Sequence, residues 1–97
     1  MSAAPPPYTV NASSHFERDV RKLVKQNKQL LSVVKAMRAV LAQDPYNLTK
    51  AHSISKLTDV KHGEGQYRIR SGDYRIRYDI TGNTVMLHSF TNRKETY

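Results

Sequence analysis

The segment from Tyr67 to Tyr78 (YRIRSGDYRIRY) constrains the fold more than any other stretch of the chain. It repeats Tyr-Arg-Ile-Arg on either side of a Gly-Asp pair, and strict alternation of this kind is typical of a β-strand. A glycine at the first central position of a two-residue connection supplies the positive φ of a type II′ turn. The sequence therefore predicts a hairpin in which Ser71 lies opposite Tyr74 and Tyr67 lies opposite Tyr78.

This register gives the hairpin two different faces. Side chains alternate along a strand, so the tyrosines and isoleucines share one face. The other face carries four arginines: Arg68, Arg70, Arg75 and Arg77. Like charges directly opposite each other destabilise a sheet. Arginines that only extend into solvent are one explanation, but an anionic partner accounts better for the pattern, either a nucleic-acid backbone or an acidic protein segment.

The composition agrees with an anionic partner and excludes several other classes of protein. The 97 residues carry a net charge of +8 and contain no cysteine, so neither disulfides nor thiolate chemistry is expected. The four histidines are scattered without the spacing of metal ligands, and we expect no metal and no cofactor. No apolar run approaches the roughly 20 residues of a membrane span. We therefore expect a cytoplasmic protein that makes no contact with a membrane.

The N-terminal half predicts a short strand and two helices. Residues 1–7 contain three consecutive prolines and predict a flexible extension ahead of a single domain over residues 8–97. A strand over 8–12 is followed by a helix that begins at a capping box formed by Ser14 and Glu17. A second helix from about residue 29 to residue 43, with Met37 in its apolar stripe, ends at Asp44-Pro45.

The C-terminal half predicts the strands around the hairpin. A strand is expected around Leu57, and Gly82-Asn83 signals a turn that pairs Tyr78 with Leu87 and Arg77 with His88. In that register Phe90 and His88 share the face of the arginines. The expected fold is α+β, with an N-terminal helical hairpin packed on one face of a mainly antiparallel four- to five-stranded sheet.

Several phrases of the sequence carry a resemblance to a known family. They are Phe16-Glu17-Arg18-Asp19, the Asp44-Pro45 break, Ser55-Lys56-Leu57, Gly72-Asp73-Tyr74-Arg75-Ile76-Arg77-Tyr78 and Arg93-Lys94-Glu95-Thr96-Tyr97. Together they resemble the RelE/ParE toxin superfamily of type II toxin–antitoxin systems, and the RelE-like branch in particular. The resemblance covers residues 8–97. It implies a compact sheet under an N-terminal helical hairpin, in agreement with the patterning.

Members like RelE cut mRNA at the ribosomal A site without a metal, by attack of the ribose 2′-hydroxyl on the adjacent phosphate. Such chemistry needs charge stabilisation, a base, an acid and a surface that holds the bases. The residues that we expect to be catalytic are Arg68, Arg70, Arg75, Arg93, Tyr97 and His88. The residues that we expect to contact RNA are Lys56, Arg77, Phe90 and Lys94.

The general base is the point at which this sequence departs from the family. Arg68 and Arg70 stand where well-known ribonuclease members have lysine, and arginine stays protonated with a pKa above about 12. These two residues can therefore clamp phosphate but are poor bases. The predicted register suggests His88 instead, opposite Arg77 and among cations that would favour its neutral form. An inert strand histidine is the alternative interpretation.

The resemblance leaves three functions open. A ribosome-dependent mRNA endonuclease that acts as a toxin agrees best with the arginines and the terminal Tyr97. A ParE-like inhibitor of DNA gyrase and a degenerate relative that only binds its antitoxin are the alternatives. The expected partners are the ribosome with its mRNA and a cognate antitoxin. An acidic or amphipathic segment of that antitoxin should cover either the basic surface or the helical hairpin.

Overall fold

The arginine hairpin forms the middle of the sheet. The computed structural model describes residues 6–93, so Lys94, Tyr97 and most of the predicted N-terminal extension lie outside the described residues. Strands β3 (Tyr67–Ser71) and β4 (Tyr74–Thr81) pair antiparallel in the predicted register. Gly72 in the turn between them has a φ of +59°, a conformation that glycine adopts without steric cost. The predicted hairpin and its two faces are confirmed.

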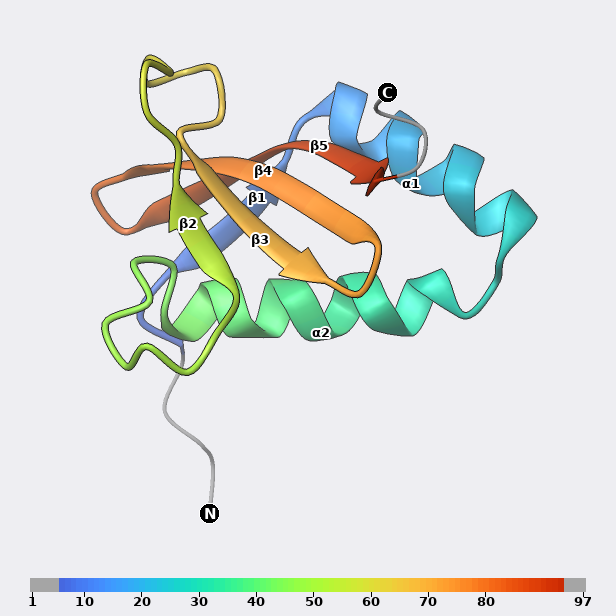
Figure 1. Ribbon diagram of the computed structural model, residues 1–97, viewed down its shortest axis with the longest axis horizontal. Helices are drawn as coiled ribbons and strands as arrows, with labels where there is room; N and C mark the ends of the chain where they lie inside the picture. The colour runs from blue at the N-terminus through green and yellow to red at the C-terminus, as the bar shows by residue number, and fades with distance from the viewer. Residues whose placement is uncertain (1–5, 94–97) are drawn as a thin grey trace.

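Three further strands complete a five-stranded sheet in the order β1-β5-β4-β3-β2 (Figure 1). Strand β1 (Thr9–Ala12) runs parallel to β5 (Thr84–Asn92), and the other neighbours are antiparallel. Strand β2 (Ile54–Lys56) ends directly before Leu57, the residue around which a strand was expected. The sheet is mainly antiparallel, as predicted.

Two helices cover one face of this sheet. Helix α1 (Ser14–Gln26) packs on β5, and helix α2 (Leu30–Gln43) contacts β1 and β3 (Figure 1). The N-cap of α1 lies one residue earlier than predicted, because the Ser13 side chain accepts the N–H of Phe16 at 3.1 Å. Ser13 can cap the helix because its own N–H is fixed by a hydrogen bond to Leu87 O on the sheet.

The core lies between the helices and the sheet. Its buried residues are Phe16, Leu23, Leu30, Val34, Met37, Leu41, Ile69, Ile76, Tyr78, Ile80, Val85, Leu87 and Phe90. Tyr78 is fully buried, and its hydroxyl donates to Pro45 O at 2.7 Å. Burial raises the pKa of Tyr78, so this hydroxyl stays protonated and acts as a donor. Within residues 6–93, no helix has the length and apolar character needed to cross a membrane.

A β-bulge changes the predicted register between β4 and β5. Tyr78 pairs with Leu87 as predicted, but Arg77 pairs with Ser89 instead of His88. The extra residue on β5 shifts the alternation by one position, so Phe90 turns into the core and is only 1% exposed. Its predicted place on the face of the arginines was therefore wrong.

Side chains of helix α1 and its N-cap form hydrogen bonds with the backbone of β5 at this bulge. Strand β1 ends opposite Leu87, so the next residues of β5 have no strand beside them on that side. The Ser13 hydroxyl donates to His88 O at 3.2 Å, and the Asp19 carboxylate accepts the N–H of Phe90 at 3.0 Å. These bonds give partners to backbone groups of β5 that lie beyond the end of β1.

Candidate nucleic-acid interface

The sheet face opposite the helices carries two rows of side chains that cross the strands. The register aligns Ser55, Arg68, Arg77 and Ser89 in the first row. The second row holds Ser53, Arg70, Arg75 and Thr91; Ser53 joins it because its carbonyl accepts the N–H of Arg70 at 2.9 Å. Each row therefore has two arginines at its centre and a hydroxyl at each end. We call Arg68, Arg70, Arg75 and Arg77 the arginine face.

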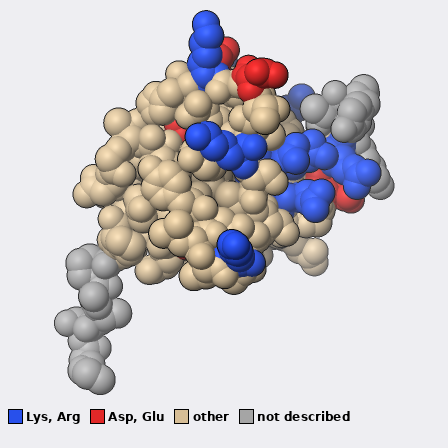
Figure 2. Space-filling model, turned by 60° about the vertical axis from the view of Figure 1, so that its left-hand side comes forward, with Lys and Arg blue, Asp and Glu red and all other residues tan. Residues whose placement is uncertain are grey.

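No carboxylate of the described residues forms an ion pair with the arginine face. Within residues 6–93 the ion pairs involve histidines only: His15 with Asp19, His52 with Asp44, and His88 with Asp79. The space-filling view shows Lys and Arg side chains gathered on one side of the molecule, beside a broad uncharged area (Figure 2). Guanidinium groups do not lose their charge in proteins, so such a surface attracts anions.

Two hollows open on this face, and Arg68 lines both. The central hollow, of about 250 Å³, is lined by Leu57, Arg68, Arg75, Arg77, Ser89 and Thr91. The edge hollow, also of about 250 Å³, lies over β2 and β3 and is lined by Ser53, Ile54, Ser55, Arg68 and Arg70. Guanidinium and hydroxyl groups supply hydrogen-bond donors, and none of the carboxylate side chains within residues 6–93 lines either hollow. This donor set suits phosphate groups.

Arg75 gives the strongest local sign of an external anion. Its Nε is buried and has no hydrogen-bond partner among the described residues. A buried donor without an acceptor costs about 1–3 kcal/mol, and the cost is larger for a charged group. An anion in the central hollow would give this guanidinium an acceptor and offset the cost.

Arg77 is used differently from the other three arginines. Its Nε and Nη2 donate to Gly65 O at 3.1 and 2.9 Å, and Nη2 also donates to Glu64 O at 3.0 Å. Gly65 has a φ of +84°, and a Cβ at this position would lie only 3.1 Å from the Cβ of Arg77. Arg77 therefore holds the loop before β3 against the sheet, and fewer of its donors remain for a ligand.

Asp79, two residues after Arg77 on β4, binds the same loop. It is 2% exposed, and its carboxylate accepts the N–H groups of Gly63, Gly65 and Gln66, each at 2.9 Å. Burial alone would raise the pKa of Asp79, but the hydrogen bonds from Gln66 and Gly65, together with His88, lower it below its usual value of 3.8. The carboxylate is therefore ionised at neutral pH.

The predicted surroundings of His88 were wrong. Its Nε2 lies 2.6 Å from Asp79 Oδ2, so the bulge places the ring against an anion instead of opposite Arg77. An ionised carboxylate is an acceptor only, so Nε2 carries a hydrogen and Nδ1 is the nitrogen that can accept a proton. Asp79 was not predicted as a site residue. The alternation of the strand could have placed it, because Tyr78 and Ile80 face the core and the residue between them must lie on the face of the arginines.

The remaining predicted site residues do not all join the arginine face. Lys56 pairs with Tyr67, and its ammonium nitrogen lies 5.8 Å from the centroid of that ring, on the side of the sheet that the helices cover. Arg93 is exposed, and its N–H donates to Asp73 O in the hairpin turn. Arg93 therefore lies at the end of the sheet where Arg70 and Arg75 flank that turn. Lys94 and Tyr97 lie outside the described residues.

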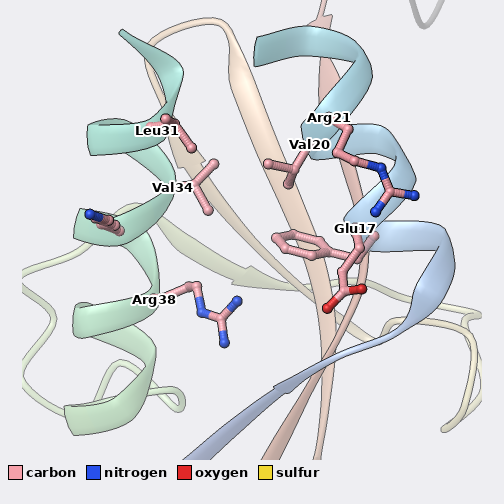
Figure 3. Close-up of a pocket in the computed structure, with 8 residues that line it drawn as sticks. Glu17, Val20, Arg21, Leu31, Val34 and Arg38 are labelled. Carbon is pink, nitrogen blue, oxygen red and sulfur yellow. The ribbon is translucent and has the colours of Figure 1, made fainter. Parts of the chain in front are cut away.

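A separate apolar groove of about 440 Å³ runs between the two helices (Figure 3). Its floor is formed by Phe16, Val20, Leu31 and Val34, and its rim carries Glu17, Arg21, Lys35 and Arg38. Three basic side chains against one acidic side chain make this rim positive. The groove lies on the helix side of the molecule and is independent of the arginine face.

Residues 6–93 contain no cluster of three or more His, Cys, Asp or Glu side chains that could hold a metal ion. The sequence matches no protein-family model and no curated protein. The fold does match solved structures. A chain of the RelBE2 toxin–antitoxin complex from Mycobacterium tuberculosis is 27% identical with a TM-score of 0.68, over 90% of this chain and 99% of that chain.

Two more distant structures have the same fold. A chain of the RelB–RelE antitoxin–toxin complex from Methanococcus jannaschii is 21% identical with a TM-score of 0.63, over 90% of this chain and 94% of that one. A chain of the DinJ–YafQ toxin–antitoxin complex from E. coli is 14% identical with a TM-score of 0.70, over 94% of this chain and 98% of that chain. The chain therefore has the RelE-like toxin fold that its sequence resembles.

Proposed function

We propose that this chain is the toxin of a type II toxin–antitoxin system and cleaves mRNA in the ribosomal A site. One observation carries the proposal: arginines and hydroxyls cross an open sheet face in two rows, and no described carboxylate pairs with the arginines. An RNA backbone offers the matching negative charge, and its 2′-hydroxyl offers the nucleophile. Cleavage on the ribosome would place the protein in the cytoplasm.

The proposed reaction is attack of the ribose 2′-oxygen on the adjacent phosphorus. A 2′,3′-cyclic phosphate forms, the bond to the 5′-oxygen breaks, and that oxygen leaves with a proton as a 5′-hydroxyl. Negative charge builds up on the phosphate oxygens in the transition state, and fixed cations at that point stabilise it. We assign this role to Arg68 and Arg75, which line the central hollow, and Arg70, opposite Arg75 on β3, adds positive charge beside it.

His88 remains our candidate for the group that accepts the 2′-hydroxyl proton. Its support is the contact with Asp79, which fixes the ring and leaves Nδ1 as the accepting nitrogen. The family resemblance adds Arg93 and Tyr97 at the C-terminal end, and Lys94 as an RNA contact. Arg77 supplies positive charge to the same surface while it holds the loop at Glu64 and Gly65.

The proposed protein partner is a cognate antitoxin. The structures with this fold include complexes described as RelB–RelE and DinJ–YafQ, in which a toxin is bound to its antitoxin. The groove between α1 and α2 has an apolar floor and a mainly basic rim, which suits an amphipathic segment with acidic side chains. We propose that the antitoxin occupies this groove, and its cover of the arginine face is the alternative.

Primer extension on a defined mRNA in a translating cell-free system tests the proposed activity. Wild-type protein should produce cuts at A-site codons that disappear when translation is blocked. An Arg75→Ala/Tyr97→Ala variant should leave the mRNA intact. A gyrase supercoiling assay run in parallel addresses the ParE-like alternative: intact mRNA together with inhibited supercoiling would contradict our proposal in favour of that function. If neither assay shows an effect, the remaining function is antitoxin binding without catalysis.

A further inference from the structure

The edge hollow is separate from the place where we put the reacting phosphate. It lies over β2 and β3, whereas the central hollow lies over β3, β4 and β5. The serines of the edge hollow stand directly beside its arginines: Ser55 pairs with Arg68, and Ser53 O accepts the N–H of Arg70. Both serines are exposed, so their hydroxyls are open to a ligand.

Arg68 connects the two hollows because it lines both of them. A guanidinium presents five N–H donors in a planar fork, so one arginine can bond two phosphates that lie on either side of it. Among the described residues, neither Arg68 nor Arg70 is paired with a carboxylate. The two hollows can therefore hold neighbouring groups of one extended anion.

We propose that the edge hollow is a second phosphate subsite, in which Ser53, Ser55, Arg68 and Arg70 bind the phosphate next to the one held in the central hollow. The ligand class is the backbone of single-stranded RNA. The inference rests on the proposed function, because it assumes that the reacting phosphate occupies the central hollow. It adds a contact beyond that phosphate, through two hydroxyls that donate to anionic oxygens.

Binding of a short RNA that cannot be cleaved tests this subsite apart from catalysis. The probe is a fluorescein-labelled hexanucleotide of 2′-O-methyl RNA, and its Kd is measured by fluorescence anisotropy at several salt concentrations. The Ser53→Ala/Ser55→Ala variant should raise the Kd about tenfold. Its salt dependence should match that of the wild type, because neutral hydroxyls release no counterions. Arg70→Ala should raise the Kd and also flatten the salt dependence.

Two control variants separate the subsite from general effects. Thr9→Ala/Ser32→Ala removes two exposed hydroxyls on β1 and α2, away from the edge hollow, and should bind as the wild type does. Ser53→Thr/Ser55→Thr keeps both hydroxyls and should restore most of the affinity. Wild-type Kd in the Ser→Ala variant, or no binding by the wild type itself, would overturn the subsite. The subsite would also be overturned if Ser53→Ala/Ser55→Ala raised the Kd for a labelled hexaglutamate peptide but not the Kd for RNA.

The outcome can be told apart from that of the cleavage proposal. RNA binding that depends on the two serines, together with intact mRNA in the translating system, would reject cleavage and keep the subsite. Cleavage by the wild type, together with RNA binding that ignores the serines, would reject the subsite and keep cleavage.

Discussion

His88 and Asp79 form a direct contact on the sheet face that carries the arginines, with His88 Nε2 at 2.6 Å from Asp79 Oδ2. Asp79 reaches this position from β4, and His88 reaches it from the bulge on β5. The contact joins the histidine to the loop at residues 63–66, because the same carboxylate accepts three of its N–H groups. The proposed base His88 is thus held by Asp79, a side chain that also binds the loop before β3.

The first prediction concerns the role of His88 in cleavage. His88→Gln should lower the rate of A-site cleavage at saturating ribosome concentration by about a hundredfold, since general acid–base catalysis commonly contributes that much or more. The variant should stay folded, because the ring is partly exposed. Circular dichroism provides the control for folding. An unchanged rate at saturation would remove His88 from the mechanism.

The second prediction is the effect of acid on stability. Folding lowers the pKa of Asp79, so its stabilisation is complete above its usual value of 3.8 and is lost as the pH falls through the lower folded value. Asp79→Asn should reduce the free energy of unfolding at pH 7 by about 2 kcal/mol, since it weakens three backbone hydrogen bonds to a buried charge.

Urea unfolding between pH 2 and pH 7 provides the measurement for this prediction. The difference in stability between wild type and Asp79→Asn should shrink as the pH is lowered, because acid removes the same charge from the wild type. A difference that stays constant over this range would show that the charge of Asp79 does not stabilise the loop.

The third prediction separates a core role of Phe90 from RNA binding. Phe90→Ala should lower the free energy of unfolding by about 3–5 kcal/mol, as expected for an aromatic side chain removed from a core. Phe90→Leu should cost less and should leave a folded protein that binds single-stranded RNA with wild-type affinity. A folded Phe90→Leu protein with clearly weakened RNA binding would contradict the inward orientation of this ring.

The fourth prediction concerns the antitoxin. Leu31 is half exposed at the groove between the helices, so Leu31→Glu should leave the fold intact and place a negative charge in the floor of the groove. Affinity for the antitoxin should fall at least about tenfold in isothermal titration calorimetry, while mRNA cleavage by the free toxin stays unchanged. Lys61→Glu also introduces a glutamate, and makes the net charge two units more negative, at an exposed position in the loop before β3, outside the groove. If only Lys61→Glu weakened binding, the antitoxin would cover the sheet side instead.

The sequence predicts most of this fold because its signals are local. The alternation from Tyr67 to Tyr78, with Gly72 in the turn, determines strands, register and faces without reference to other parts of the chain. The bulge at His88 could not be predicted in this way. It depends on Ser13 and Asp19, which meet β5 only after the helix has packed on the sheet.

The same contrast between local signals and long-range contacts applies to the candidate site. Arg68, Arg70 and Arg75 could be placed together from the hairpin alone, and the structure confirms that they share one face. Phe90 and the surroundings of His88 were misplaced because one inserted residue reverses the alternation of a strand. The hydroxyls at the ends of the two rows went unnoticed, since Ser53 and Thr91 join the arginines only through pairing with distant strands.

The most direct test of the central claim is the cleavage of a defined mRNA on purified ribosomes with an empty A site. We predict that the wild type cuts in the A site and leaves a 2′,3′-cyclic phosphate and a 5′-hydroxyl. Arg68→Ala/Arg70→Ala/Arg75→Ala should be at least about a hundredfold slower. Lys22→Ala/Lys25→Ala/Lys28→Ala removes the same charge from exposed positions in and after α1 and should cut at the wild-type rate. Equal rates for the two triple variants, or an uncut mRNA with the wild type, would contradict the claim that the arginine face performs this reaction.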